Sequence, residues 1–467
     1  MINRTSLIAA AALGACVAAA PLGAQSTTEL ERGIDSVAKA VLKATGVPSA
    51  SVAVVRHGTL MYADAYGDAK LQPPTPATPD MRYAIGSISK QFTATAVLLL
   101  QQQGKLSLDD KVAKWIPGLT DGNQVTIRQI LSHTSGYQDY WPQDYVPPEM
   151  ERPTTPDAIL ARWAKRPLDF TPGSRWQYSN TNFVIAGLIV QKASGMPFFQ
   201  FLRTNVLNRV GITSAVDFDQ RGPSSVQPVG YLRYALGPLH PAPSTGPNWM
   251  FAAGELAMTA SDLAKWDISI ITQSLLSPAS YHMLETTTLL NSGLSSGYGL
   301  GVDVVSFNGH RMIEHDGEVS GFTAENMVFP DDSVAVVVLT NQDAAPASGA
   351  IGSRIAQLLF RTTDPVTEQR TAQAKRIFEG LQKGEIDRSL FTPNANAYFS
   401  AQALADFTSS LGPLGAPKSF VQTRQALRGG MTLRSYLVTF ANGKTVRAWT
   451  FETPDGKLEQ YQVAPIG

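Results

Sequence analysis

Apolar and polar residues follow first a helical period and then a strand-like one. Residues 29–45 show the helical period, and Gly46-Val47-Pro48 ends this predicted helix because proline and the residue before it resist helical backbone angles. Residues 51–55 and 60–66 are rich in β-formers and flank His57-Gly58, a tight-turn signal, so they predict a hairpin. The sheet is therefore expected to begin with antiparallel strands.

A long apolar helix is predicted next. Residues 72–79 are rich in proline and are expected to form a surface loop, followed by a short extended stretch at 81–85. Residues 87–103 contain no glycine or proline and are rich in alanine and leucine, which favours a buried helix that ends at Gly104. Ser87 is thus expected at the leading end of this helix.

The rest of the main domain is predicted to be helical first and then stranded. Helical segments between Pro/Gly loops, with little strand signal, fill residues 106–266. Strands return at 299–307, 310–316, 323–329 and 334–340, and a helix at 350–360 closes the domain. The predicted fold class is α/β (α+β), with an antiparallel sheet flanked by helices and an inserted all-helical region, over residues 25–363.

A second, smaller domain is predicted for residues 372–467. The chain turns polar around 364–371, a helix follows near 373–383, and Asn442-Gly443 and Asp455-Gly456 mark hairpin turns between short strands. The order of these elements is similar to a nuclear-transport-factor-like cone fold. The alternative is a generic α+β accessory domain.

The N-terminal pattern predicts export. Residues 1–4 carry one positive charge, an apolar, Ala-rich run spans 7–20, and small residues lead to Ala24, which together indicate a secretory signal peptide cleaved after Ala24. The run is shorter than the roughly 20 apolar residues of a membrane anchor. We therefore expect a periplasmic or secreted protein. As an alternative, Leu13-Gly14-Ala15-Cys16 resembles the lipobox of bacterial lipoproteins, which would place a lipid anchor on Cys16.

Composition narrows the function classes. Lys+Arg and Asp+Glu balance at 38 each in the 467 residues, so the bulk charge does not favour a nucleic-acid or anionic-membrane partner, and a small-molecule or short peptide substrate fits better. Cys16 is the only cysteine and leaves with the signal peptide, which excludes thiol catalysis and disulfides. The six histidines show no clustered ligand spacing, so neither a metal nor another cofactor is expected, and nothing indicates an oligomeric state.

Ser87-Ile88-Ser89-Lys90 places a hydroxyl and an amine about one helical turn apart. A serine hydroxyl is a weak nucleophile until a neighbour removes its proton, and a lysine whose pKa is lowered by burial is able to do so. Ser36-Val37-Ala38-Lys39 has the same spacing but lies within a polar helix, whereas Ser87 begins a strongly apolar one. Ser87 is therefore the candidate nucleophile.

Two further segments carry candidate chemistry. Tyr178 and Asn180 stand two residues apart on a loop that enters a helix, and they offer a phenol for proton transfer and an amide for orienting a substrate carbonyl. His315-Asp316-Gly317-Glu318 lies on a predicted strand, where Gly317 permits close backbone approach and the next N–H suits an oxyanion. Taken alone, each segment is more often structural: a buried tyrosine with a capping asparagine, and a strand histidine.

Together, and in this order, these elements resemble the serine β-lactamase and penicillin-binding protein superfamily, in its class C-like branch. That branch uses Ser-x-x-Lys, Tyr-x-Asn and a Lys/His-x-Gly strand. The resemblance covers roughly residues 29–360. Segments that are also similar to the family are 131–136, 252–256, 262–264, 298–301 and 321–322.

The resemblance implies roles for the candidate residues. Ser87 would form an acyl-enzyme, with Lys90 and Tyr178 sharing the general-base and general-acid work, and it leaves open which of the two is the base. The oxyanion would bind the N–H groups of Ser87 and Glu318. Asn180 would orient the substrate, and His315 would replace the lysine found in many β-lactamases.

The sequence departs from the family pattern in its acidic residues. Asp316 stands where many members have Thr or Ser, and Glu318 adds a second carboxylate, so anionic β-lactams and D-Ala-D-Ala peptides are expected to be poor substrates. Esters or amine-bearing D-peptides are expected to be better, in a carboxylesterase or D-amino-acid peptidase. Because side chains alternate along a strand, at least one of the two carboxylates is expected to point away from the site.

Three alternatives remain beside this interpretation. One is a true class C-like β-lactamase or D-Ala-D-Ala carboxypeptidase, and another is a catalytically silent scaffold, which would normally have lost the serine, lysine or tyrosine. The third is an α/β-hydrolase that uses Gly293-Leu294-Ser295-Ser296-Gly297, but that motif must follow a strand and open a helix, and its flanks here are loop-like.

Overall fold

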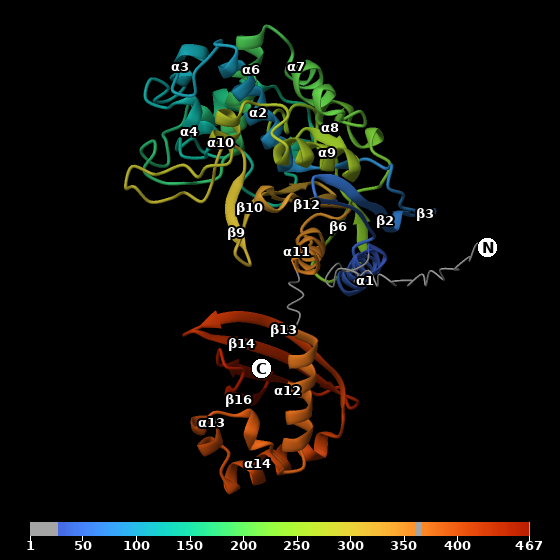
Figure 1. The fold of residues 1–467 in the computed structure, drawn as a ribbon. Coiled ribbons are helices and arrows are strands. Elements are labelled where there is room, and N and C mark those ends of the chain that lie inside the picture. Colours follow the sequence, from blue (N-terminus) through green and yellow to red (C-terminus); the bar gives the residue numbers. More distant parts are fainter. Residues whose placement is uncertain (1–26, 361–366, 467) are drawn as a thin grey trace, which may run out of the picture. The chain divides into compact units, whose positions relative to one another are not determined.

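The computed structural model of the protein describes residues 27–360 and 367–466 (Figure 1). The chain divides into two compact units, one spanning Gln25–Phe360 and one formed by the residues that follow. The expected signal peptide and the lipobox at Cys16 lie outside the described residues. Within the described ranges, no helix combines the length and apolar character needed to cross a membrane.

The first unit is built on a seven-stranded antiparallel sheet of order β3-β2-β1-β12-β11-β10-β9. Its central pair joins β1 near the start of the unit to β12 near its end, so the whole helical region is inserted between neighbouring strands. The fold class predicted from the sequence is thus confirmed. The strands are β1 Ser49–Arg56, β2 Thr59–Leu71, β3 Pro74–Pro76, β9 Asp303–Phe307, β10 His310–Val319, β11 Phe322–Phe329 and β12 Val334–Thr340.

Alternation along the central strands builds two separate cores. On β1, Val52 and Val54 join the core formed with α1 (Thr27–Thr45) and α11 (Ala347–Leu359), which lie side by side along one face of the sheet (Figure 1). Ala53 and Val55 join the larger core on the opposite face, where α9 (Ala260–Ile271) packs on the same strand. A central strand that is buried on both faces has a continuous run of apolar residues in its sequence.

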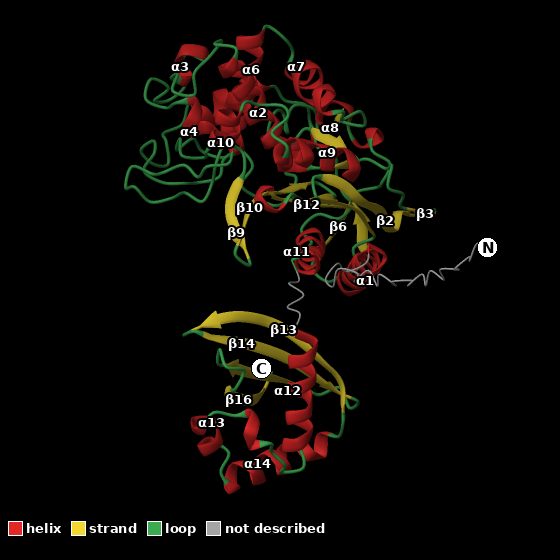
Figure 2. Cartoon of the chain, viewed as in Figure 1, coloured by secondary structure: helices red, strands yellow, loops and turns green. Residues whose placement is uncertain are grey.

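The inserted region places α2 (Ser89–Gln102) at its centre, surrounded by the other helices (Figure 2). Most of α2 is buried, including the polar residues of its first turn, because a helix enclosed on all sides has no solvent face. This enclosure is what places the amine of Lys90 in the interior. The other helices of the region are α3 Val112–Trp115, α4 Ile127–Leu131, α5 Pro156–Ile159, α6 Asn180–Ser194, α7 Phe198–Leu202, α8 Phe218–Arg221 and α10 Pro278–Leu284.

The expectation of little strand structure between residues 106 and 266 was wrong in part. The region contains four strands of two or three residues, which are too short to show alternation in sequence. Three short strands pair as β4-β8-β5, and β4 leads directly to Ser87. The four strands are β5 Val216–Asp217, β6 Tyr231–Arg233, β7 Leu239–Pro241 and β8 Leu256–Met258, and β4, which precedes the region, is Tyr83–Ala84.

Two further boundaries differ from prediction. The proline-rich segment 72–79 is not wholly loop, because β3 within it pairs with β2 at the edge of the sheet. The strand expected at 299–307 begins only at Asp303. Gly301 has a φ of +73°, a conformation outside the β region, and this turn ends the loop before the strand starts.

The second unit packs three helices against a four-stranded antiparallel meander, β13-β14-β15-β16. Phe378 on α12 and Tyr436 and Tyr461 on the sheet are fully buried in its core. Asn442-Gly443 and Asp455-Gly456 form two of its hairpin turns, as the sequence predicts. The likeness to a cone fold stays a prediction. The elements are α12 Thr367–Leu381, α13 Pro393–Tyr398, α14 Ala401–Leu411, β13 Pro417–Arg428, β14 Met431–Phe440, β15 Thr445–Glu452 and β16 Leu458–Pro465.

Candidate active site

Ser87 lies between β4 and the first turn of α2. The helix begins at Ser89 rather than at Ser87, which sits in the short 3-10 turn Gly86–Ile88 that precedes it. Lys90 Nζ lies 2.9 Å from Ser87 Oγ, and the Tyr178 hydroxyl donates to the same oxygen at 2.8 Å. Three residues that the sequence singled out separately thus meet at one atom.

The Lys90 amine is buried and surrounded by hydrogen-bond acceptors. Besides Ser87, it contacts Asn180 Oδ1 at 2.9 Å and the carbonyl oxygen of Ala253 at 2.7 Å. Burial lowers the pKa of Lys90 to about 7, although the charges of Asp139, Glu255 and Asp316 act to raise it. A substantial share of neutral amine is therefore present near pH 7, as a general base requires.

Tyr178 is held in place by the start of α6, which follows it directly, and by the ring of His133. The next residue, Ser179, stands at the N-cap position of α6, which runs to Ser194 and ends at Gly195 in the left-handed conformation that favours glycine. The His133 ring packs on the Tyr178 ring with centroids 4.3 Å apart, and His133 Nδ1 accepts from the Ser179 N–H at 3.2 Å. Burial raises the pKa of Tyr178 well above its usual value of 10, so its phenol stays protonated.

Asn180 is oriented by a carboxylate that the sequence analysis missed. Asp139 accepts from the Asn180 backbone N–H at 2.9 Å and from its side-chain Nδ2 at 3.2 and 3.3 Å. His133 was missed as a site residue as well, although its segment had been singled out as similar to the family. No spacing in the sequence predicts the contact between Asp139 and Asn180, because it depends on how the loop that carries Asp139 lies against the start of α6.

Two glycines let β10 touch the turn that holds Ser87. A Cβ on Gly317 would lie 2.0 Å from the carbonyl oxygen of Ile85 and 3.3 Å from the backbone nitrogen of Ser87. A Cβ on Gly86, whose φ is +52°, would lie 2.7 Å from the backbone nitrogen of Glu318. The backbone of β10 at Gly317 and Glu318 is therefore in direct contact with the turn that holds Ser87, and the oxyanion hole expected from their N–H groups stays a prediction.

His315 is buried, and its ring nitrogens bond to groups other than Ser87. Its Nε2 accepts from the Tyr298 hydroxyl at 2.8 Å, and its Nδ1 donates to the backbone oxygen of Asp316 at 2.5 Å. Burial lowers the pKa of His315 to about 4, so the ring is neutral at physiological pH. Both ring nitrogens are used in these bonds, and a direct role for His315 toward substrate stays a prediction.

Only one of the two acidic residues of β10 lines the cavity, as expected, but alternation along the strand is not the reason. Asp316 and Glu318 stand two residues apart, so they share one face of the strand. Asp316 is 83% exposed, and its charge acts on the pKa of Lys90 and Tyr178. Glu318 instead lines the cavity that opens at Ser87.

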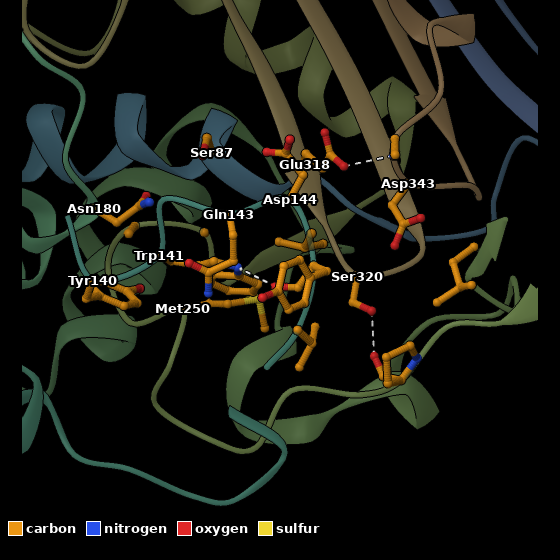
Figure 3. Close-up of a pocket in the computed structure, with 18 of the residues that line it drawn as sticks. Ser87, Tyr140, Trp141, Gln143, Asp144, Asn180, Met250, Glu318, Ser320 and Asp343 are labelled. Carbon is orange, nitrogen blue, oxygen red and sulfur yellow. Dashed lines mark hydrogen bonds between the residues drawn. The ribbon is translucent and has the colours of Figure 1, made fainter. Parts of the chain in front are cut away.

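That cavity has a volume of about 390 Å3, within the usual range for small-molecule sites (Figure 3). Its lining includes Ser87, Asn180 and the aromatic side chains of Tyr140 and Trp141. Figure 3 shows Glu318 and Asp343 on the side of the cavity opposite Asn180. The carboxylates that line it are Asp144, Glu318 and Asp343.

Among the described lining residues, three carboxylates stand beside one cation, Arg233. One guanidinium nitrogen lies 2.9 Å from the place a Cβ would take on Gly46, a residue outside the cavity. Charge therefore favours a cationic group, rather than an anionic one, at this wall of the cavity.

Known proteins resemble this chain in sequence and in fold. The family model for beta-lactamase matches residues 34–359. Penicillin-binding protein 4* of Bacillus subtilis is 26% identical over 348 residues, which cover 70% of this chain and 76% of that protein. A D-stereospecific amidohydrolase from Streptomyces superposes with a TM-score of 0.61 at 27% identity, covering 71% of this chain and 99% of that one. A D-amino acid amidase from Ochrobactrum anthropi shares the fold, with a TM-score of 0.63 at 21% identity over 71% of this chain and 98% of its own. The chain therefore belongs to the beta-lactamase family, within the superfamily of serine β-lactamases and penicillin-binding proteins.

Proposed function

We propose that this protein hydrolyses ester or amide bonds through an acyl-enzyme on Ser87. The observation that carries the proposal is the meeting of Lys90 Nζ and the Tyr178 hydroxyl at Ser87 Oγ, at 2.9 and 2.8 Å. An amine whose pKa is about 7 is suited to take the serine proton, and a phenol that stays protonated is suited to give one to the leaving group. Lys90 is thus the proposed general base and Tyr178 the proposed general acid.

The reaction follows from these positions. The Ser87 proton passes to Lys90 Nζ as Oγ attacks the carbonyl carbon, and the N–H groups of Ser87 and Glu318 hold the resulting oxyanion. Tyr178 protonates the departing oxygen or nitrogen as the old bond breaks, and the proton on Lys90 restores the phenol. Water then attacks the acyl-enzyme and releases the acid and the free serine.

The charge of the cavity supports a preference for substrates that carry an amine. Three carboxylates, those of Asp144, Glu318 and Asp343, line the cavity. These carboxylates repel the carboxylate of a β-lactam and attract an ammonium group. The likeness to a D-stereospecific amidohydrolase favours the same choice, a D-amino-acid peptidase or a carboxylesterase with weak or no β-lactamase activity.

A panel of matched substrates tests this proposal on purified protein, with Ser87→Ala as the control. D-Ala-p-nitroanilide and its N-acetyl derivative differ only in the charged amine, p-nitrophenyl butyrate tests ester cleavage, and nitrocefin tests β-lactam cleavage. We expect Ser87 to react with a fluorophosphonate probe, and the free amine to be cleaved about tenfold faster than its acetylated form. In the Glu318→Gln and Asp343→Asn variants, the cleavage rate of the free amine relative to that of the acetylated form should decrease.

Two outcomes would contradict the proposal. Rapid nitrocefin hydrolysis with negligible ester turnover would favour the alternative of a class C-like β-lactamase or D-Ala-D-Ala carboxypeptidase. A folded wild-type protein whose Ser87 does not react with the probe would favour the catalytically silent scaffold.

A further inference from the structure

A chain of partly buried polar contacts leads from the proposed base to the Asp139 carboxylate. Lys90 Nζ contacts Asn180 Oδ1 at 2.9 Å, and the amide nitrogen of Asn180 donates to Asp139 at 3.2 and 3.3 Å. Asp139 is itself held in place, because its Oδ1 accepts the backbone N–H groups of Asn180 at 2.9 Å and Trp141 at 3.1 Å. The chain thus ends on fixed backbone groups.

Asp139 decides which way round the Asn180 amide lies. A side-chain amide has an accepting oxygen on one side and a donating NH2 on the other, whereas a carboxylate only accepts. The NH2 must therefore face Asp139, and the amide oxygen must face Lys90. The reversed amide would place an oxygen against the Asp139 carboxylate and lose both bonds.

The orientation of the amide decides in turn where the lone pair of Lys90 points. A neutral amine has two N–H donors and one lone pair. Asn180 Oδ1 and the Ala253 carbonyl oxygen only accept, so they take both N–H groups, and the lone pair is left for the third neighbour, the Ser87 hydroxyl. With a reversed amide, the NH2 of Asn180 would donate to Lys90 and occupy that lone pair.

We propose that Asp139 is a positioning residue that, through the Asn180 amide, aims the lone pair of Lys90 at the hydroxyl of Ser87. The inference rests on the proposed function, since it concerns how the proposed base is prepared for its task. Asp139 touches neither Ser87 nor the reacting atoms.

Asp139 also acts through its charge, which predicts the direction of a pH effect. A negative charge favours the protonated amine and so raises the pKa of Lys90 against the effect of burial. Removing the charge lowers that pKa, and the acid limb of the reaction, where Lys90 becomes protonated, moves to lower pH. The ionisable groups that act electrostatically on Lys90, or on which Lys90 acts, are Asp139, His133, Glu255, His315 and Asp316, and the phenol of Tyr178 packs beside it.

A single and a double substitution separate orientation from general destabilisation. In Asp139→Asn, the two backbone N–H groups keep an oxygen at the Oδ1 position, where Asn180 Nδ2 still has an acceptor. The new NH2 at the Oδ2 position faces the NH2 of Asn180, so the native amide orientation loses one of its two bonds and is less favoured. In the double variant Asp139→Asn/Asn180→Asp, the new amide donates to the new carboxylate, which only accepts and again faces Lys90. The double variant restores the lone-pair direction and brings the negative charge one residue closer to Lys90.

The measurement is the pH dependence of the second-order rate of fluorophosphonate labelling at Ser87. We expect Asp139→Asn to lower the alkaline plateau about tenfold and to move the acid limb down by roughly 1 pH unit, as loss of one nearby charge does. The double variant should regain most of the plateau and move the acid limb above that of the wild type. Asp219→Asn is the matched control, because Asp219 also accepts two backbone N–H groups, from Asn248 and Met250, and its acid limb should not move.

The outcomes distinguish this inference from the proposed function. A wild-type protein that is not labelled at Ser87 would overturn the proposed function itself. A labelled wild type whose acid limb and plateau are unchanged in Asp139→Asn would overturn only the inference. The inference would also be overturned by a double variant that folds, as judged by its thermal transition, but whose labelling rate at the alkaline plateau does not recover and whose acid limb does not move.

Discussion

Replacing Gly317 by alanine tests whether close backbone contact builds the oxyanion hole. The new Cβ would lie 2.0 Å from the Ile85 carbonyl oxygen, and real Cβ atoms essentially never come within 3.0 Å of a neighbour. The strand and the turn that holds Ser87 must therefore separate by at least 1.0 Å, the difference between 3.0 and 2.0 Å. Because the obstacle is backbone rather than the end of a side chain, no rotamer change relieves it.

The expected loss follows from that displacement. The N–H groups of Ser87 and Glu318 belong to the two segments that are pushed apart, so the distance between the two oxyanion donors grows. Removal of one such donor lowers kcat by about 10²- to 10³-fold, and a misplacement of about 1 Å has a similar cost. We expect kcat for an ester substrate to fall about 10²-fold in Gly317→Ala.

The assay compares kcat and the thermal transition of this variant with those of Gly33→Ala. Gly33 lies in α1, where a Cβ would meet only the flexible end of Leu358 at 3.2 Å, and alanine favours a helix by about 1 kcal/mol over glycine. Gly33→Ala should keep full activity. A folded Gly317→Ala protein with kcat within threefold of the wild type would refute the link between this close approach and catalysis.

Two further predictions concern proton transfer and export. Tyr178→Phe keeps the ring packed on His133 but removes the proton donor. We expect kcat/KM to fall by about 10²-fold or more for a p-nitroanilide, and much less for a p-nitrophenyl ester, because the leaving group of the ester departs unprotonated. Equal losses of kcat/KM for the two substrates would argue against Tyr178 as the general acid. Mass spectrometry of the protein exported from a bacterial host should find Gln25 as the first residue, whereas a lipid-modified Cys16 would show that the lipobox alternative is correct.

The regular parts of the fold could be predicted because their patterns are local. The continuous apolar run of β1 and the long glycine-free segment of α2 each reflect burial of a whole element, which shows directly in sequence. The short strands β5 and β8 were missed because two or three residues cannot display a period, whereas β4 falls within the extended stretch expected at 81–85. β8 pairs with β5 in the same inserted region and with β4, which lies more than 100 residues earlier in the chain.

The residues of the candidate site also divide into those that a local sequence motif reveals and those that it does not. Ser87, Lys90, Tyr178 and Asn180 could be named in advance because each stands in a short motif whose spacing has a chemical reason, and the structure brings all four together. Asp139 stands in no such motif. Its role becomes visible only when the loop that carries it is placed against the start of α6, 41 residues later in the chain.

The carboxylates of the cavity show why motif position alone misjudges specificity. Glu318 accepts the backbone N–H of Ala344 at 2.8 Å, and Asp343 accepts that of Gly321 at 2.9 Å, so each fastens the loop that carries the other. Each bond uses one oxygen and leaves the second one available to a ligand. The same pair therefore fixes the shape of the wall and gives it its charge. Asp316, which the motif singles out beside Glu318, contributes charge from outside the cavity, while Asp343 lines it from a different strand end.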